Sequence, residues 1–343
     1  MTAYRVVQWA TGTIGVRSLR AVVEHPGLTL AGVYVHTPGK AGRDAGELCG
    51  LGPTGVTATQ DIEEIVGSGA DCVLYMPLVC DLDEVCRLLE SGANIVTTRG
   101  EFHHPPSMDP DVRKRVEAAC ERGCTSIHST GSSPGFITEA VPLVLTSIAR
   151  RLDSLTIDEF ANLSRRPSPE LLFDVMGFGA APAEFGEERL THARTSFGPS
   201  LRLVADALSL PLDSLEADGE VATARHRIRI AAGELAPGTV AAQRLTVTGR
   251  HAGRPLLRFR ATWYCTTDLD PAWDLHDTGW HISVESDAPL EVGIRFPVPL
   301  DRMAAVSPSY TANRAVNAVP FVCAAAPGIR TTPDLPQITA TLS

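Results

Sequence analysis

The first fifteen residues constrain the fold of this 343-residue chain more than any other stretch. Residues 5–9 (RVVQW) have the composition of a buried strand, and residues 10–15 (ATGTIG) have that of a tight turn. Residues 16–24 then carry apolar side chains at helical spacing, namely Val16, Leu19, Val22 and Val23. A strand, a glycine-containing turn and a helix in this order are typical of the opening of a dinucleotide-binding βαβ unit.

The turn indicates how a pyrophosphate would be held. Backbone N–H groups must approach the phosphates closely, and the helix N-terminus adds the positive end of its dipole. Gly12 permits that approach, and Gly15 permits tight packing of the helix on the strand. Ala10 replaces the usual first glycine, which the turn tolerates if it needs no positive φ there. A structural turn without a ligand is the alternative. The predicted cofactor contacts are Ala10, Thr11, Gly12, Thr13, Ile14 and Gly15.

The end of the second predicted strand, residues 28–35, bears on the choice of cofactor. An acidic residue about 20 positions after the glycines usually binds the ribose hydroxyl of NAD. This chain has His36 and Thr37 there, followed by Lys40 and Arg43. An imidazole, a hydroxyl and cations suit a 2′-phosphate better than a bare hydroxyl. We therefore expect NADP(H), with NAD(H) possible, and His36, Thr37 and Lys40 as contacts; a solvated loop is the alternative.

Strands and helices alternate regularly up to residue 150, which predicts an N-terminal Rossmann domain with a doubly wound parallel sheet over residues 1–150. Further on, residues 221–231, 241–250, 256–266, 280–285 and 290–296 alternate apolar and polar side chains. That pattern predicts a C-terminal α+β domain with an open, largely antiparallel sheet, a substrate and dimerisation domain over residues 151–306. Residues 307–343 are expected to form a helix and tail that pack back on the first domain. An uncovered apolar sheet face would favour a homodimer.

Composition excludes several classes of partner. The net charge is −10, and no basic run with interleaved aromatic residues suggests a nucleic acid. No apolar run is long enough to span a membrane, and since a strand is predicted from residue 5 onwards, we expect no signal peptide. The eight cysteines are scattered without a Cys-x-x-Cys pair, which predicts reduced thiols in a cytoplasmic protein and no metal site.

The candidate chemistry lies beyond the carboxyl ends of the strands, where open α/β sheets bind ligands. After the strand at 94–98, Glu101 stands between a glycine and Phe102. A carboxylate beside an apolar wall can exchange protons near neutral pH. The alternatives are a loop residue paired with Arg99, or a role for His103 and His104 instead. Further strand-end residues are predicted to contact the cofactor, namely Met76, Pro77, Thr98 and Ser132.

Four motifs, at residues 7–15, 32–36, 42–46 and 98–102, together resemble the 2,4-diaminopentanoate dehydrogenase-like family. This family includes the native amine dehydrogenases and is a branch of the dihydrodipicolinate reductase superfamily. The resemblance implies a homodimer that carries out reversible reductive amination of a ketone or aldehyde with ammonia and NAD(P)H. It also implies that Glu101 matches the family's essential glutamate and handles the protons of ammonia and of the carbinolamine.

Alternatives for the substrate remain open. The predicted pocket residues are Phe136, Ile137, Thr138 and Phe173, which favour a small apolar carbonyl compound. A 2,4-diaminopentanoate dehydrogenase proper would need a grip for a carboxylate, for which Arg165 or Arg166 is a candidate. A carbonyl or imine reductase that needs no ammonia is a second enzyme alternative. An NADP(H)-binding sensor without catalysis is an alternative of another class.

Overall fold

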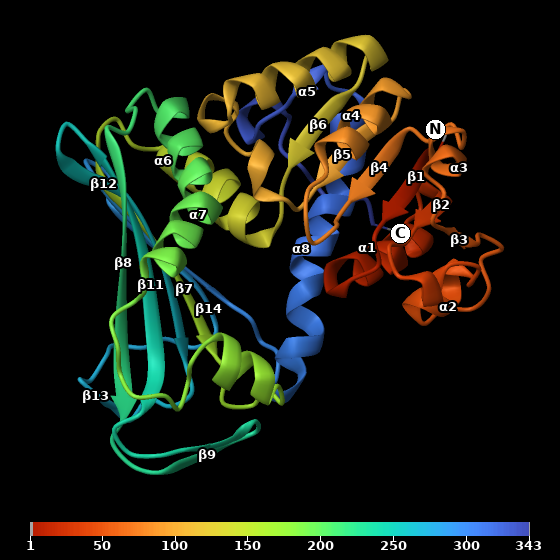
Figure 1. The fold of residues 1–343 in the computed structure, drawn as a ribbon. Helices are drawn as coiled ribbons and strands as arrows, with labels where there is room; N and C mark the ends of the chain where they lie inside the picture. Colours follow the sequence, from red (N-terminus) through yellow and green to blue (C-terminus); the bar gives the residue numbers. More distant parts are fainter. Residues whose placement is uncertain (1–2, 343) are drawn as a thin grey trace. The chain divides into compact units, whose positions relative to one another are not determined.

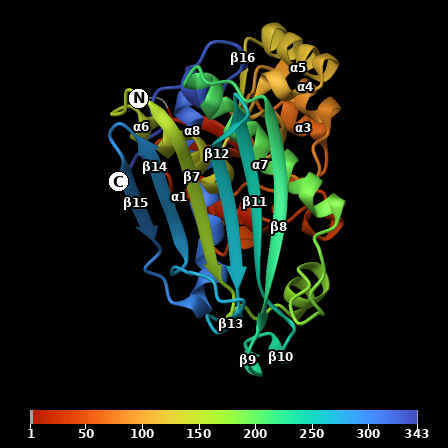
Figure 2. The same cartoon turned by 90° about the vertical axis from the view of Figure 1, so that its left-hand side faces the viewer.

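The computed structural model describes residues 3–342, which contain two seven-stranded sheets (Figures 1 and 2). The chain divides into two compact units. One runs to Phe136 and resumes at Ser307, and the other is Ile137–Val306. The boundary predicted at residue 150 thus falls inside the second unit. No helix within residues 3–342 combines the length and the apolar character needed to cross a bilayer.

The sheet of the first unit is parallel throughout, which confirms the predicted Rossmann-like architecture. Its strand order is β16-β6-β5-β4-β1-β2-β3. The sequence patterns do not reveal β3 and β16, because strands of two residues carry no periodicity. The strands are β1 (Tyr4–Trp9), β2 (Leu28–Tyr34), β3 (Ala58–Thr59), β4 (Cys72–Tyr75), β5 (Asn94–Thr97), β6 (Ser126–Ser129) and β16 (Gly328–Ile329).

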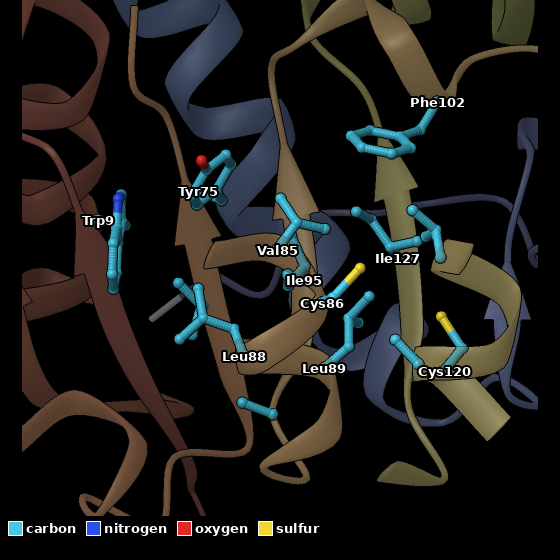
Figure 3. Close-up of a cluster of buried hydrophobic side chains, with 14 of the residues drawn as sticks. Trp9, Tyr75, Val85, Cys86, Leu88, Leu89, Ile95, Phe102, Cys120 and Ile127 are labelled. Carbon is cyan, nitrogen blue, oxygen red and sulfur yellow. The ribbon is translucent and has the colours of Figure 1, made fainter. Parts of the chain in front are cut away.

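Helices cover both faces of this sheet. Side chains of consecutive strand residues point to opposite faces, so Ile95 packs on one side and Val96 on the other. The Ile95 side is covered by α4 and α5 (Figure 3), and the Val96 side by α1 and α8. Asp81 and Asp109 start α4 and α5 as N-caps, because their carboxylates accept backbone N–H bonds of the first turn. The helices are α1 (Thr13–Glu24), α2 (Ala45–Cys49), α3 (Ile62–Val66), α4 (Leu82–Glu90), α5 (Pro110–Gly123) and α8 (Leu300–Cys323).

The second unit holds a mixed, mostly antiparallel sheet in the order β13-β8-β11-β12-β7-β14-β15, and a separate β9–β10 hairpin. Only the β12–β7 pair of the seven-stranded sheet is parallel. Helix α7 (Glu187–Ala207) covers one face, where the rings of Phe197 and Phe259 stack 4.1 Å apart. A short helix, α6 (Val141–Thr146), precedes the sheet. The strands are β7 (Leu152–Asn162), β8 (Ser214–Ala224), β9 (Ile228–Ile230), β10 (Gly233–Leu235), β11 (Val240–His251), β12 (Arg254–Tyr264), β13 (Leu269–Asp270), β14 (Gly279–Ser286) and β15 (Leu290–Arg295).

Two expectations for this sheet are wrong. The strand predicted over residues 221–231 is broken at residues 225–227, where Arg225 bonds to the carbonyl oxygen of Leu269 at 2.6 Å and His226 pairs with Asp268. The sheet face opposite α7, which faces the viewer in Figure 2, is polar and not apolar. It carries ion pairs such as Arg260–Asp158 and Arg250–Glu216. An exposed apolar face is therefore no reason to expect a dimer.

Candidate cofactor and catalytic site

The turn after β1 is held by one side-chain bond and one backbone bond. The side-chain amide of Gln8 donates to the carbonyl oxygen of Ala10 at 2.9 Å, and the N–H of Ala10 donates to the carbonyl oxygen of Tyr34 in β2 at 2.9 Å. Ala10 has a φ of +69°, so the expectation that this position needs no positive φ is wrong. The reason is that the Ala10 carbonyl turns back over α1, where a Cβ on Gly15 would lie 2.1 Å from its oxygen. Glycine at position 15 is therefore required by close backbone approach.

The N-terminus of α1 has the features of an anion site. Gly12 is its N-cap, with no side-chain cap and no acidic residue in the first turn. A Cβ on Gly12 would meet no atom within 4 Å, so the backbone is open at this point. The amino group of Lys40, in the short helix that follows β2, donates to the carbonyl oxygen of Thr11 at 2.8 Å and to its hydroxyl at 3.1 Å. A cation thus lies beside the turn that precedes the positive end of the helix dipole, a combination that fits a phosphate.

The other residues predicted at the adenosine end of the cofactor are His36, Thr37 and Arg43, and they are exposed or paired elsewhere. His36 and Thr37 are exposed after β2, and the His36 ring meets the Tyr34 ring edge-on at 5.2 Å. Arg43 pairs with Glu47 one helical turn further on, at 2.7 Å. Of the two cations considered for a 2′-phosphate, Lys40 bonds to the glycine turn, whereas Arg43 bonds to Glu47. The structure therefore brings Lys40 and Thr11 together and leaves His36 and Thr37 as solvent-exposed neighbours.

The chain after β4 changes from buried to exposed within four residues. The side chain of Met76 packs in the core with Val96, and Pro77 is buried as well. Leu78 and Val79 follow with exposed fractions of 90% and 73%. Thr98 is half-buried directly after β5, and the Ser132 hydroxyl lies 2.7 Å from that of Thr311 in α8. A contact of Met76 with a cofactor would therefore involve its backbone more than its side chain.

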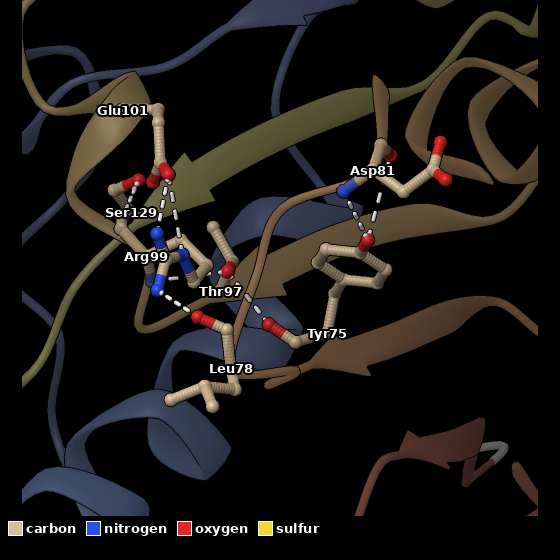
Figure 4. A network of polar contacts seen from close by, with 7 residues as sticks. All are labelled: Tyr75, Leu78, Asp81, Thr97, Arg99, Glu101 and Ser129. Carbon is tan, nitrogen blue, oxygen red and sulfur yellow. Dashed lines mark hydrogen bonds and ion pairs between the residues drawn. The ribbon is translucent and has the colours of Figure 1, made fainter. Parts of the chain in front are cut away.

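Glu101 lies in a one-turn 3-10 helix, Gly100–Phe102, at the carboxyl end of β5. Phe102 is fully buried in the core beneath it and anchors this turn (Figure 3). The Glu101 side chain is 39% exposed. Its Oε1 atom accepts two bonds from Arg99, at 2.6 Å from Nη2 and 3.2 Å from Nε (Figure 4). The ion pair that the sequence allowed as an alternative is thus present, and it is compatible with a role in proton transfer.

Arg99 itself is fixed by three strand ends. Its Nη1 donates to the carbonyl oxygen of Leu78 at 2.6 Å, and its own backbone is bonded to the hydroxyls of Thr97 and Ser129 (Figure 4). Burial lowers the pKa of Arg99, but the hydrogen bond and charge of Glu101 outweigh this and leave it raised. Burial and then the charge of Glu101 raise the pKa of the nearby Cys80 thiol to about 12. The network therefore contains one fixed cation, one carboxylate and a neutral thiol.

The two histidines that follow are buried in the loop after Phe102. The Nδ1 atom of His104 lies 2.7 Å from the Ser107 hydroxyl, and His103 is only 2% exposed. Within residues 3–342, no three His, Cys, Asp or Glu side chains lie close enough together to hold a metal ion.

Sequence reasoning did not find the bond from Arg99 to Leu78 or the one from Ser129 to Arg99. Contacts across strands of a sheet leave no pattern in the sequence.

The predicted pocket residues belong to different units. Phe136 is the last residue of the first segment of unit one, and its ring lies 5.7 Å from the Arg314 guanidinium. Ile137 and Thr138 are fully buried at the start of the second unit. Phe173 packs in a core cluster of that unit. Their association in one substrate pocket stays a prediction.

Comparison with known proteins places the chain in a family. The model of the 2,4-diaminopentanoate dehydrogenase C-terminal domain matches residues 136–343, and that of the dihydrodipicolinate reductase N-terminus matches residues 6–80. The chain belongs to the 2,4-diaminopentanoate dehydrogenase family. This confirms the resemblance carried by the four sequence motifs.

The relatives of this family member match it over different shares of its length. An amine dehydrogenase from Streptomyces virginiae is 28% identical over 344 residues, covering 96% of this chain and 95% of the relative. The 2,4-diaminopentanoate dehydrogenase of Acetoanaerobium sticklandii is 22% identical over 135 residues, or 38% of each chain. A solved amine dehydrogenase from Mycobacterium smegmatis has a TM-score of 0.75 at 21% identity, covering 98% of this chain and 97% of that one. This last similarity shows a shared fold.

Proposed function

We propose that the chain is an NAD(P)H-dependent amine dehydrogenase, which converts a small ketone or aldehyde and ammonia into a primary amine in a reversible reaction. The observation that carries the proposal is the carboxylate of Glu101, which Arg99 holds at the carboxyl end of β5 (Figure 4). Ligands of open parallel sheets bind at this edge. The full-length relative named as an amine dehydrogenase supports the reaction class.

Glu101 is the proposed catalytic residue. Ammonia attacks the carbonyl carbon, and the carboxylate takes a proton from the attacking nitrogen. Glu101 returns this proton to the alkoxide oxygen, which gives the neutral carbinolamine. A second proton, taken up from ammonium in the buffer and passed on by the same carboxyl group, then lets the hydroxyl leave as water. The remaining carboxylate stabilises the positive iminium by its charge. Bound nicotinamide supplies the hydride that converts the iminium into the amine.

The cofactor is held by the open N-terminus of α1 and by Lys40. Gly12 lets the pyrophosphate approach the backbone, and the N–H groups of Thr13 and Ile14 belong to the first turn. The cationic Lys40 favours NADP(H), with NAD(H) as the alternative. Met76, Pro77, Thr98 and Ser132 are proposed near the nicotinamide end, because each follows a strand of the sheet at its carboxyl end.

Activity measurements test the reaction. NADPH oxidation with short ketones and aldehydes is followed near pH 9 with and without ammonia, for the wild type and for Glu101→Gln, which keeps the size of the side chain but cannot take a proton. We expect oxidation to require ammonia and to fall by a factor of about 100 or more in the variant. Oxidation without ammonia would indicate a carbonyl or imine reductase. NADPH binding without turnover of any compound would favour the sensor.

The cofactor preference has its own test. Lys40→Ser removes the cation beside Thr11, and we expect it to raise KM for NADPH at least about tenfold more than KM for NADH. Arg20→Ser is the control, because Arg20 forms an exposed ion pair with Glu24 on α1. Equal effects of Lys40→Ser on both cofactors would place Lys40 at the pyrophosphate and not at the 2′-phosphate.

Three further features stay predictions of this proposal. The substrate is expected to be small and mostly apolar and to meet Phe136, Ile137, Thr138 and Phe173. The enzyme is expected to be a homodimer, which sedimentation of the purified protein would test. Its location is expected to be cytoplasmic.

A further inference from the structure

Arg99 is the residue that connects Glu101 to the rest of the sheet edge. Three bonds of its guanidinium reach in two directions, two of them to Oε1 of Glu101 and one to the carbonyl oxygen of Leu78. Glu101 follows β5 and Leu78 follows β4, so a single planar group joins the loops after two neighbouring strands (Figure 4). Guanidinium groups suit this task because their donors have a fixed fork geometry.

The backbone of Arg99 is fixed as firmly as its side chain. Its N–H donates to the Thr97 hydroxyl at 3.1 Å, and its carbonyl accepts from the Ser129 hydroxyl at 2.7 Å. The Thr97 hydroxyl in turn donates to the carbonyl oxygen of Tyr75 at 2.6 Å. Strands β4, β5 and β6 therefore all contribute to holding this one residue. An ordinary surface arginine, with its long flexible stem, has no such support.

The two oxygens of the Glu101 carboxylate are left in different positions. Both bonds from Arg99 end on Oε1, and no bond to Oε2 is present within residues 3–342. The side chain is 39% exposed, so Oε2 is the oxygen available to a ligand. Burial and then the charge of Glu101 raise the pKa of the Cys80 thiol, in the loop after β4, to about 12, so this thiol is neutral near pH 9.

We propose that Arg99 is the positioning residue for Glu101: it anchors Oε1, so that Oε2 is presented to ammonia and to the carbinolamine hydroxyl. This inference rests on the proposed amine dehydrogenase function. The pair acts through orientation more than through stability, because half-exposed ion pairs contribute little to folding. Removing Arg99 frees the carboxylate to rotate, because both bonds to Oε1 come from Arg99.

The test compares Arg99→Gln and Arg99→Lys with the control Arg113→Gln. Arg113 pairs with Glu117 on α5 at 2.8 Å, with exposed fractions of 42% and 39% that resemble those of the Arg99–Glu101 pair. The measurements are kcat, KM for ammonia, KM for the carbonyl compound and the Kd of NADPH. All rates are measured at one pH and over a range of free ammonia concentrations. Far-UV circular dichroism and the urea midpoint check the fold of each variant.

For Arg99→Gln we expect kcat/KM for ammonia to fall about 10- to 100-fold, since small misplacements of a catalytic group have effects of this size. The loss should fall on kcat and on KM for ammonia and leave KM for the carbonyl compound within about twofold. Arg99→Lys should recover part of the rate, since it restores one donor to Oε1 without the fork. The Kd of NADPH should stay within about twofold, and Arg113→Gln should match the wild type in every measurement.

Different failures have different meanings. If Arg99→Gln is folded and has the wild-type kcat and KM for ammonia, the positioning role is refuted while the amine dehydrogenase function stands. If Arg99→Gln raises KM for the carbonyl compound and the Kd of NADPH as much as KM for ammonia, and Arg99→Lys recovers nothing, Arg99 is a structural residue only and the positioning role is refuted. If the wild type shows no ammonia-dependent turnover although it binds NADPH, both the function and this inference are refuted.

Discussion

Replacing Gly15 with alanine separates the stability of the glycine turn from its ability to bind a cofactor. A Cβ at position 15 would lie 2.1 Å from the carbonyl oxygen of Ala10, far below the 3.4 Å at which ordinary contacts begin. The obstacle is backbone, and that backbone is itself bonded to Gln8 and to β2. The turn must therefore shift, and α1 must move away from β1.

The expected magnitude combines two opposing effects. Alanine is better than glycine inside a helix by about 1 kcal/mol, which favours the variant. Overpacking against a rigid wall costs about 1–3 kcal/mol or more, and a contact this short lies at the upper end. We expect a net loss of about 1–2 kcal/mol in the free energy of unfolding, together with a loss of NADPH affinity.

Gly12→Ala is the matched control. Nothing lies within 4 Å of a Cβ at position 12, and its φ of −74° suits alanine. Loss of an N-cap glycine should cost under about 1 kcal/mol, so this variant folds but places a methyl group where the pyrophosphate is expected. Urea unfolding and NADPH titration measure both variants. A Gly15→Ala protein as stable as the wild type would refute the close approach, and full NADPH affinity in Gly12→Ala would refute the phosphate position.

Three smaller predictions concern other charged groups. Asp158→Ala should cost about 2–3 kcal/mol in urea unfolding, because it leaves Arg260 without its buried partner; a loss below about 0.5 kcal/mol would contradict this. Iodoacetamide at pH 8 should label the exposed Cys124 well before Cys80, whose pKa is raised to about 12; equal labelling in peptide mass spectra would contradict it. Backbone N–H bonds, first that of Thr54, lower the pKa of Asp44 from its ordinary value of 3.8. The stabilising effect of ionised Asp44 is therefore complete above pH 3.8 and is lost as pH falls through the lower pKa of the folded state. The urea midpoints of wild type and Asp44→Asn should accordingly converge in acid.

The sequence was sufficient for the architecture of the first unit, because its elements are long enough to show their period. The helices α4 and α5 and the buried strands β4 and β5 follow directly from their apolar patterns and aspartate caps. It was not sufficient where tertiary contacts override local preference. Ala10 takes a positive φ because of the packing of α1, and the strand predicted at 221–231 is interrupted by ion pairs to β13 and its neighbours.

The residues of the candidate site could be predicted one by one, but the hydrogen bonds between them could not. Glu101 stands out because it follows a strand end and precedes an anchored phenylalanine. Its partner Arg99 was visible only as a nearby charge. The bonds from Arg99 to Leu78 and from Ser129 to Arg99 join residues 21 and 30 positions apart, and they depend on the register of three strands.

The strand order explains why these connections exist. Strand β1 lies between β4 and β2, so the glycine turn that follows it is flanked by the loop after β4 and the loop after β2. Lys40 follows β2 and therefore reaches Thr11 in that turn. Strand β5 lies between β4 and β6, so Arg99 reaches Leu78 on one side and Ser129 on the other. The cation beside the phosphate site and the cation beside Glu101 are thus both consequences of one parallel sheet, whose carboxyl ends collect loops that are distant in the sequence.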